Sequence, residues 1–85
     1  MQTDHYRSKM EAIEVMRNVL SNEEFRGFLL GNVYKYLIRH PHKGNPIGDL
    51  QKAIDYIKAL EVMLVDPDCM NPFEVIRNQK QNTNG

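Results

Sequence analysis

The chain has 85 residues, enough for one small domain, and a domain of this size buries only a modest core. Eleven Lys and Arg residues balance eleven Asp and Glu residues, which excludes a uniformly basic surface and argues against nucleic acid as a partner. One cysteine, no apolar leader at the N-terminus and no apolar run long enough to cross a bilayer predict a soluble, cytoplasmic protein with no membrane partner.

The first predicted element is an amphipathic helix over residues 9–20. Ile13, Met16 and Leu20 recur at helical spacing, and charged side chains stand between them. The next four residues, Ser-Asn-Glu-Glu at 21–24, have the pattern of a capping box, in which a Ser hydroxyl and a Glu carboxylate satisfy each other's backbone N–H groups. A second helix is therefore predicted to begin there.

The second predicted helix carries a wide apolar set, which indicates contact with more than one neighbour. The set is Phe25, Phe28, Leu29, Leu30, Val33, Leu37 and Ile38. Gly31 lies inside this helix, where glycine costs roughly 1 kcal/mol relative to alanine, so it indicates close approach of another backbone or a ligand. The run His-Pro-His-Lys-Gly-Asn-Pro at 40–46 contains two prolines and a glycine, so it is expected to end the helix and form a loop.

The third predicted helix begins at Asn45-Pro46, because Asn is a good N-cap and Pro suits the first helical position. It is expected to run from Pro46 to Leu64, with Ala53 as a small contact point. Its apolar seam comprises Ile47, Leu50, Ile54, Ile57, Leu60 and Leu64. Asn71-Pro72 is expected to cap a short last helix through Ile76.

These elements predict an all-α fold, a small domain of three to four helices around a central antiparallel helical hairpin. Residues 1–77 are expected to form this single helical domain, and residues 78–85 a flexible polar tail. Because so small a core gains from a partner chain, we expect a homo-oligomer.

The stretch GNVYKYLIRHPHKGNP at residues 31–46 contains no carboxylate, although the whole chain is neutral. On the second helix a polar stripe at three- to four-residue spacing comprises Asn32, Lys35, Tyr36 and Arg39, and Lys43 follows in the loop. On the third helix a second polar stripe comprises Asp49, Lys52 and Tyr56. An antiparallel hairpin would bring the end of the first stripe beside the start of the second.

Two interpretations of the stripes stay open. They either line a pocket for a phosphorylated small ligand or decorate a solvent-facing surface, with Arg39 complementing the negative C-terminal end of its helix. In the pocket interpretation, Arg39 and Lys43 hold phosphate, Tyr36 or Tyr56 stacks on a base or sugar, and Asn32 or Asp49 binds polar edges.

No metal ion or other cofactor is predicted, and no catalytic residue is assigned. His5, His40, His42 and Cys69 lack the spacing of a structural zinc site. Glu11 and Glu14 resemble half of a magnesium site, but the sequence has no matching second acidic cluster. Magnesium is expected only if the chain is a kinase.

Taken together, the residues resemble the SaV-like family of small phage and prophage domains, whose function is unknown. The resemblance covers residues 4–60 and is strongest in the elements "GN..KY..R" and "DL.KA..Y". One phage nucleotide kinase, which lacks a Walker loop and works as a large oligomer, contains a domain similar to this one. The resemblance implies a nucleotide or nucleotide-like ligand near His5, Tyr6, Asn32, Lys35, Tyr36, Arg39, Asp49 and Tyr56.

The leading hypothesis is a small phage-type protein in the host-cell cytoplasm that sequesters or manages a nucleotide at an oligomer interface. A cyclic or dinucleotide defence signal is one candidate ligand. A nucleotide monophosphate kinase or phosphohydrolase is the first alternative, although three short helices cannot easily enclose a donor, an acceptor and a metal ion. A protein that blocks a host enzyme through the apolar remainder of the first two helices is the second alternative.

Overall fold

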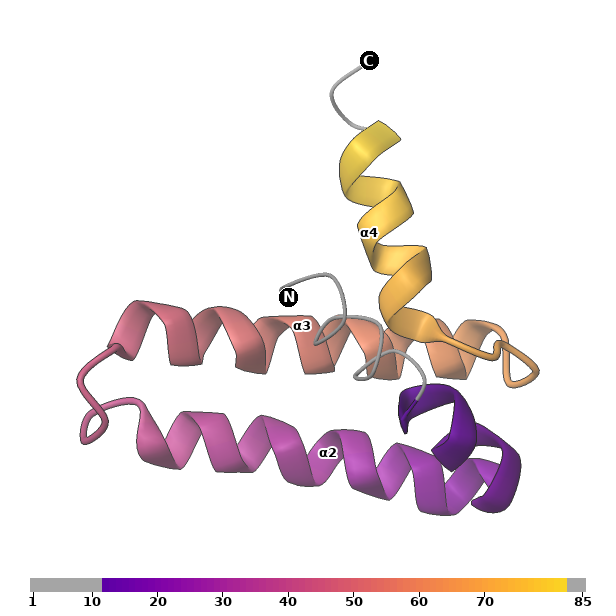
Figure 1. The fold of residues 1–85 in the computed structure, drawn as a ribbon, viewed down its shortest axis with the longest axis horizontal. Coiled ribbons are helices and arrows are strands. Elements are labelled where there is room, and N and C mark those ends of the chain that lie inside the picture. Colours follow the sequence, from indigo (N-terminus) through magenta and orange to yellow (C-terminus); the bar gives the residue numbers. More distant parts are fainter. Residues whose placement is uncertain (1–11, 83–85) are drawn as a thin grey trace.

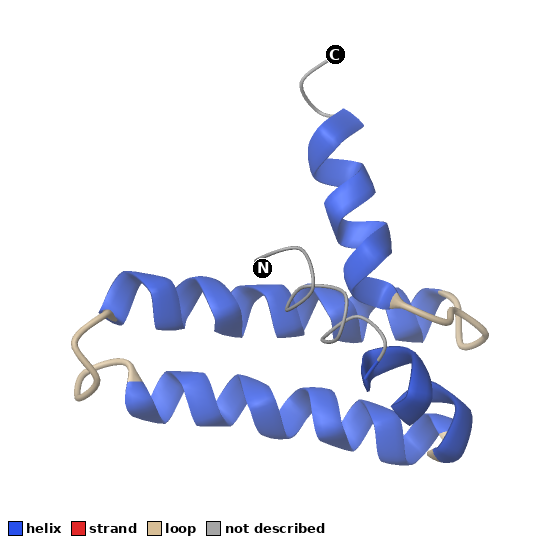
Figure 2. Ribbon diagram, viewed as in Figure 1, coloured by secondary structure: helices blue, strands red, loops and turns tan. Residues whose placement is uncertain are grey.

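The computed structural model describes residues 12–82, and every regular element in this range is a helix. Helix α2 spans Asn22–Arg39, α3 spans Pro46–Val65 and α4 spans Pro72–Asn82, while residues 12–19 form a helical segment ahead of α2. Helices α2 and α3 lie side by side and antiparallel, and α4 rises steeply from the C-terminal part of α3 (Figure 1). Short loops connect the helices (Figure 2). The predicted all-α fold with a central antiparallel hairpin is confirmed.

Side-chain caps determine where α2 and α3 begin. The Glu24 N–H donates to Ser21 Oγ at 3.1 Å, and the Ser21 N–H donates to Glu24 Oε1 at 2.8 Å. At the start of α3 the Gly48 N–H donates to Asn45 Oδ1 at 3.1 Å, and Pro46 occupies the first turn. Each cap satisfies backbone donors that have no partner within the helix. Both predicted helix starts are confirmed.

Helix α4 begins as predicted but continues further. Asn71 Oδ1 accepts hydrogen bonds from the N–H groups of Phe73 and Glu74, at 3.1 and 3.3 Å. The sequence placed the end of this helix at Ile76, and that was wrong, because α4 reaches Asn82. Ile76 is buried, and residues 77–79, the last ones whose burial the structure describes, are exposed. Arg, Gln and Lys are good helix formers, so the helix can continue through this exposed stretch.

The main hydrophobic core lies at the open end of the hairpin, away from the α2–α3 loop. The segment 12–19 and α4 meet the hairpin there (Figure 1). The buried cluster comprises Ile13, Phe25, Leu29, Ala59, Met63 and Ile76. The loop end of the hairpin therefore depends more on its own side-chain contacts. None of the helices in residues 12–82 combines the length and apolar composition needed to cross a membrane.

Arg17 ties the segment 12–19 to the rest of this core. Its Nε donates to the Cys69 carbonyl at 2.8 Å, and its Nη2 donates to the Pro67 carbonyl at 2.9 Å. Its Nη1 donates to Asn22 Oδ1 at 3.1 Å, and its guanidinium lies 5.2 Å from the centre of the Phe25 ring. One guanidinium thus connects the α3–α4 loop with the start of α2, a role that its polar position in the sequence did not indicate.

The hairpin differs from the expectations in the buried faces of its two helices and at Gly31. Helix α3 buries Asp49, Ala53, Ala59 and Met63, whereas Ile47, Ile54, Ile57 and Leu64 of the predicted seam are exposed. Helix α2 buries Phe25, Leu29 and Val33 but exposes Leu30, Leu37 and Ile38. Ala53, Ala59 and Met63 lie in the interior, and the three isoleucines of α3 lie to one side. No backbone of residues 12–82 approaches Gly31 closely, because a Cβ added there would meet nothing within 4 Å; approach of a ligand stays a prediction.

Candidate functional site

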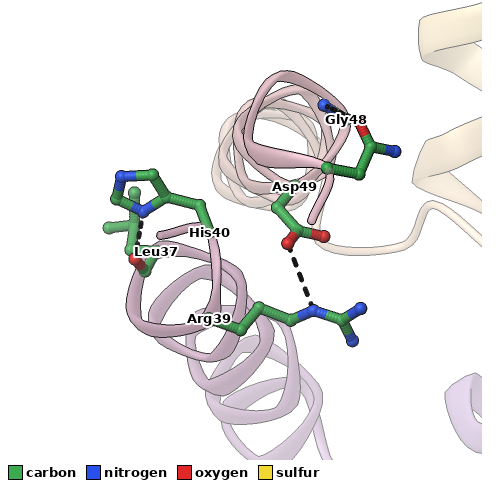
Figure 3. A network of polar contacts seen from close by, with 6 residues as sticks. Leu37, Arg39, His40, Gly48 and Asp49 are labelled. Atoms are coloured by element: carbon green, nitrogen blue, oxygen red, sulfur yellow. Dashed lines mark hydrogen bonds and ion pairs between the residues drawn. The ribbon is translucent and has the colours of Figure 1, made fainter. Parts of the chain in front are cut away.

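An ion pair joins the two helices at the loop end of the hairpin. Nε of Arg39, in the last turn of α2, lies 3.3 Å from Oδ2 of Asp49, in the first turn of α3. The Asp49 residue is only 4% exposed, whereas the Arg39 side chain is 42% exposed. The positive N-terminal end of α3 also favours a carboxylate at this position. Figure 3 shows the outer guanidinium nitrogens of Arg39 pointing away from this carboxylate.

Three cationic side chains gather around one aromatic ring beside this pair. Lys35 Nζ lies 4.6 Å from the centre of the Tyr36 ring, and Arg39 Cζ lies 5.6 Å from it. Lys52 reaches the same ring from α3, with Nζ 6.0 Å from its centre. At these distances the negative face of the ring attracts each cation. We call Lys35, Arg39 and Lys52, together with Tyr36, the cation cluster.

A row of aromatic rings holds Tyr36 in place. Tyr36 and Tyr56 stack with ring centres 5.9 Å apart and an interplanar angle of 21°. Tyr56 also meets Phe28 and Phe73 edge to face, at 6.3 and 5.1 Å. Tyr56 is surrounded by the other three rings of the row. The cations instead lie over Tyr36, at the end of the row. Burial raises the pKa of the Tyr56 hydroxyl above its ordinary value, with smaller contributions from Tyr36 and Asp55.

The charge balance of the cluster differs in part from the expectation. The sequence indicated unneutralised cations, but Asp49 pairs with Arg39, so that expectation was wrong for the Nε edge of this guanidinium. The Nη groups of Arg39 have no partner among residues 12–82, and Lys35 and Lys52 form no ion pair with a described residue. Among the described residues, Asp49 pairs with one of the three cations and Asp55 acts on the neighbouring Tyr56 hydroxyl, so three cations face two carboxylates and a small local excess of positive charge remains, which suits an anion.

The structure brings together six of the ten predicted site residues. These six are Lys35, Tyr36, Arg39, Asp49, Lys52 and Tyr56. The expected meeting of the two polar stripes at the loop is therefore confirmed.

The other four predicted residues lie elsewhere or outside the described range. Asn32 Nδ2 donates to the Phe28 carbonyl of its own helix at 2.9 Å, and Lys43 is exposed in the loop. His5 and Tyr6 lie outside the described residues. The His40 Nδ1–H donates to the Leu37 carbonyl at the end of α2 (Figure 3).

The sequence interpretation missed Phe73 as a support of the site, and took Phe28 only as an apolar core position. The signal for Phe73 was weak, since it is simply the apolar residue that follows the Asn71-Pro72 cap. Within residues 12–82 no group of three or more His, Cys, Asp or Glu side chains is arranged to hold a metal ion. The ligand chemistry of this end of the hairpin is therefore that of ammonium, guanidinium and phenol groups.

The fold and the cluster define a class: a small helical-hairpin domain with a cationic, aromatic surface site. The chain belongs to the family described as proteins of unknown function, DUF3310, which matches residues 1–58. This range contains all ten predicted site residues and ends inside α3, so α4 lies beyond it. No curated protein and no solved structure matches the chain.

Proposed function

We propose that the cation cluster binds the phosphate of a nucleotide and that the chain sequesters or manages this nucleotide without converting it. The observation that supports this proposal is the gathering of Lys35, Arg39 and Lys52 from two helices around Tyr36, with Asp49 paired to one of them. Like charges on neighbouring helical positions repel, and a bound anion relieves that cost.

The roles within the proposed site follow from the geometry. The ammonium groups of Lys35 and Lys52 and the outer nitrogens of Arg39 donate to phosphate oxygens. Asp49 holds the Nε edge of Arg39, so it positions the guanidinium and leaves the outer nitrogens for the ligand. The Tyr36 face that Lys35 covers becomes a stacking surface for a base when this flexible side chain turns toward the phosphate.

The biological setting of the proposal comes from the sequence resemblance. The chain resembles the SaV-like family of phage and prophage domains, and one phage nucleotide kinase contains a similar domain. We therefore place the protein in the host-cell cytoplasm, as a homo-oligomer that binds a nucleotide. A cyclic or dinucleotide defence signal is a candidate ligand, because such a signal is neutralised by binding alone.

Calorimetric titration with inorganic phosphate and a panel of mono-, di- and cyclic nucleotides tests the proposal. We expect at least one nucleotide to bind more tightly than phosphate, and we expect its affinity to fall as salt is added. The double variant Lys35→Ala, Lys52→Ala should weaken binding at least tenfold, since each charge-assisted hydrogen bond is worth about 1.5–3 kcal/mol.

Lys58→Ala is the matched control. Lys58 is an exposed lysine of α3 that lines a groove of about 650 Å³ against α4, away from Tyr36. Its removal should leave the nucleotide affinity unchanged. No heat with any nucleotide overturns the proposal. If a bound nucleotide is converted to product in the presence of magnesium, the chain is an enzyme, either a kinase or a phosphohydrolase, and the sequestration proposal is wrong.

A further inference from the structure

Helix α3 carries a second apolar pattern, most of which is exposed in the single chain. The positions 47, 50, 54, 57, 61 and 64 alternate in steps of three and four, which is the spacing of the apolar seam in a coiled coil. All of them are apolar except Glu61. The exposed fractions are 75% for Ile47, 43% for Ile54, 45% for Ile57 and 68% for Leu64. Helix α3 thus shows a nearly complete coiled-coil seam to its surroundings.

Helix α2 extends this apolar surface. Leu30 and Leu37 are 45% and 41% exposed, and they are one heptad apart. By helical rotation they lie on one side of the buried row of Phe25, Leu29 and Val33, and Lys35 and Arg39 lie on the other. On α3 the same rotation places Ile54 and Ile57 opposite Lys52. We define the seam surface as Leu30, Leu37, Ile47, Leu50, Ile54, Ile57, Glu61 and Leu64.

We propose that the seam surface binds a second copy of this chain, with α3 packed antiparallel against α3 of the partner. Two hairpins joined in this way form a four-helix arrangement with coiled-coil packing at its centre. Monomeric domains seldom leave so continuous an apolar surface in water, and a domain of 85 residues has little other core to stabilise it. The inference does not rest on the proposed nucleotide binding.

Glu61 is the first reason for the antiparallel orientation. A parallel pair with aligned heptads would place the two Glu61 carboxylates opposite each other in an apolar seam, where like charges repel. An antiparallel pair centred between positions 54 and 57 places Glu61 opposite Leu50 of the second copy instead. The repulsion is then removed, and Ile47 meets Leu64.

The distribution of charge is the second reason. The loop end of the hairpin exposes Lys43, and the open end has an acidic excess, with Glu23, Glu24, Glu61, Asp66 and Asp68 exposed against the partly exposed Arg26 and the exposed Lys58. An antiparallel second copy brings each acidic end over a loop end. The surface is therefore complementary to itself in charge as well as in apolar pattern, which argues for a second copy over an unrelated protein.

This arrangement separates association from ligand binding. The seam surface and the cation cluster lie on opposite sides of the hairpin, so both clusters of a dimer stay accessible. The sequence had suggested a ligand held at the oligomer interface, and the proposed dimer places the interface on the other side of the hairpin.

Sedimentation equilibrium of the full chain tests the association. We expect the wild type to associate, and we expect Ile57→Glu to have the monomer mass with an unchanged helical circular dichroism spectrum. Ile38→Glu is the matched control, because Ile38 is 70% exposed on α2 outside the seam surface, and this variant should keep the wild-type mass. A monomeric wild type, or an Ile57→Glu variant that keeps the wild-type mass, overturns the proposal.

Disulfide trapping in a Cys69→Ala background tests the orientation. Leu50→Cys and Glu61→Cys chains, mixed before oxidation, should form a cross-linked heterodimer, and neither variant alone should cross-link. Cross-linking of each variant with itself overturns the antiparallel orientation. If an associated wild type gives no cross-link in any combination, the seam surface is not the interface.

Discussion

The Arg39 guanidinium donates through Nε to Oδ2 of Asp49 at 3.3 Å, and this contact fixes the last turn of α2 to the first turn of α3. The Asp49 carboxylate is buried, whereas the Arg39 side chain is partly exposed to solvent. A charge pair of this kind does not make the hairpin stable by itself, because desolvation of Asp49 offsets much of the attraction. It does fix the direction of Arg39, whose outer nitrogens are directed away from Asp49 (Figure 3).

Removing one partner of the Arg39–Asp49 ion pair should lower the free energy of unfolding. Arg39→Ala is expected to lower the free energy of unfolding by about 1–3 kcal/mol, because the buried Asp49 carboxylate loses its partner. Asp49→Asn keeps an oxygen acceptor and should cost less. Urea denaturation followed by circular dichroism measures both values. The double variant Arg39→Ala, Asp49→Asn completes the cycle. If its loss of unfolding free energy equals the sum of the two single losses, the residues are not coupled and the prediction is wrong.

Replacing Arg17 by lysine should destabilise the open end of the hairpin. An ammonium group cannot reproduce the directed bonds that the Arg17 guanidinium makes to Cys69, Pro67 and Asn22. Arg17→Lys is expected to lower the free energy of unfolding by about 1–3 kcal/mol. Arg26→Lys, on α2, is the control and should stay within about 0.5 kcal/mol of wild type. Equal effects of the two substitutions would contradict the role assigned to Arg17.

Two glycines should respond to alanine in opposite directions. Gly31 is helical and exposed with open space around it, so Gly31→Ala should raise the free energy of unfolding by about 0.5–1 kcal/mol. Gly44 has φ +82° in the α2–α3 loop, where a side chain is strained, so Gly44→Ala should lower it by about 1–2 kcal/mol. Thermal denaturation of both variants measures the signs. A destabilised Gly31→Ala chain would show that some group does approach Gly31.

The Tyr56 hydroxyl should make the fold sensitive to alkali. Burial, followed by Tyr36 and Asp55, raises its pKa in the folded chain above the ordinary value of about 10. The unfolded chain therefore loses this proton at a lower pH than the folded chain does. The stability that Tyr56 contributes is complete below about pH 10 and is lost as the pH rises through the folded-state pKa.

Tyr56→Phe removes this proton, so its free energy of unfolding should fall less steeply than that of the wild type above about pH 10. Urea denaturation at a series of alkaline pH values gives the slopes. Tyr34→Phe is the control, because Tyr34 is exposed on α2, and it should keep the wild-type slope. A Tyr56→Phe slope equal to that of the wild type would contradict the prediction.

The starts of α2 and α3 could be predicted from local sequence patterns. Ser21 with Glu24, and Asn45 with Pro46, each satisfy backbone donors within a few residues, so short sequence patterns were enough to place the starts of α2 and α3. The end of α4 was missed because the polar residues after Ile76 include no helix breaker and show no apolar periodicity. Helix breakers such as proline are visible in a sequence, and a helix that ends without one is not.

The buried face of α3 was harder to predict than its helical state. Periodicity identifies an apolar side, and α3 has two candidate sides: the large residues Ile47, Ile54 and Ile57, and the smaller pair Ala53 and Ala59. The hairpin uses the second side for its interior, where Met63 is buried as well. A sequence pattern cannot distinguish a face that meets its own chain from a face that is left exposed, because both are equally apolar.

The candidate site shows the same division between local and distant information. The two polar stripes followed from helical spacing, and their meeting followed from the hairpin. The pairing of Arg39 with Asp49 and the row from Tyr36 through Tyr56 to Phe73 depend on how the helices rotate against each other. The sequence indicated Ala53 as a small contact point, and Ala53 is buried, but helical spacing alone does not give the rotation of one helix against the other.

The position of the main core at the open end has a dynamic consequence. Outside the main core, the loop half of the hairpin buries Val33, Asp49 and Ala53 among the described residues, and the contacts Tyr36–Tyr56 and Arg39–Asp49 join its two helices, so we expect this end to open before the rest of the fold. Backbone amides near the α2–α3 loop should then exchange with deuterated solvent faster than those around Phe25 and Met63. An anion bound by both Lys35 and Lys52 would bridge the two helices at this end. Its binding should therefore slow amide exchange near the α2–α3 loop.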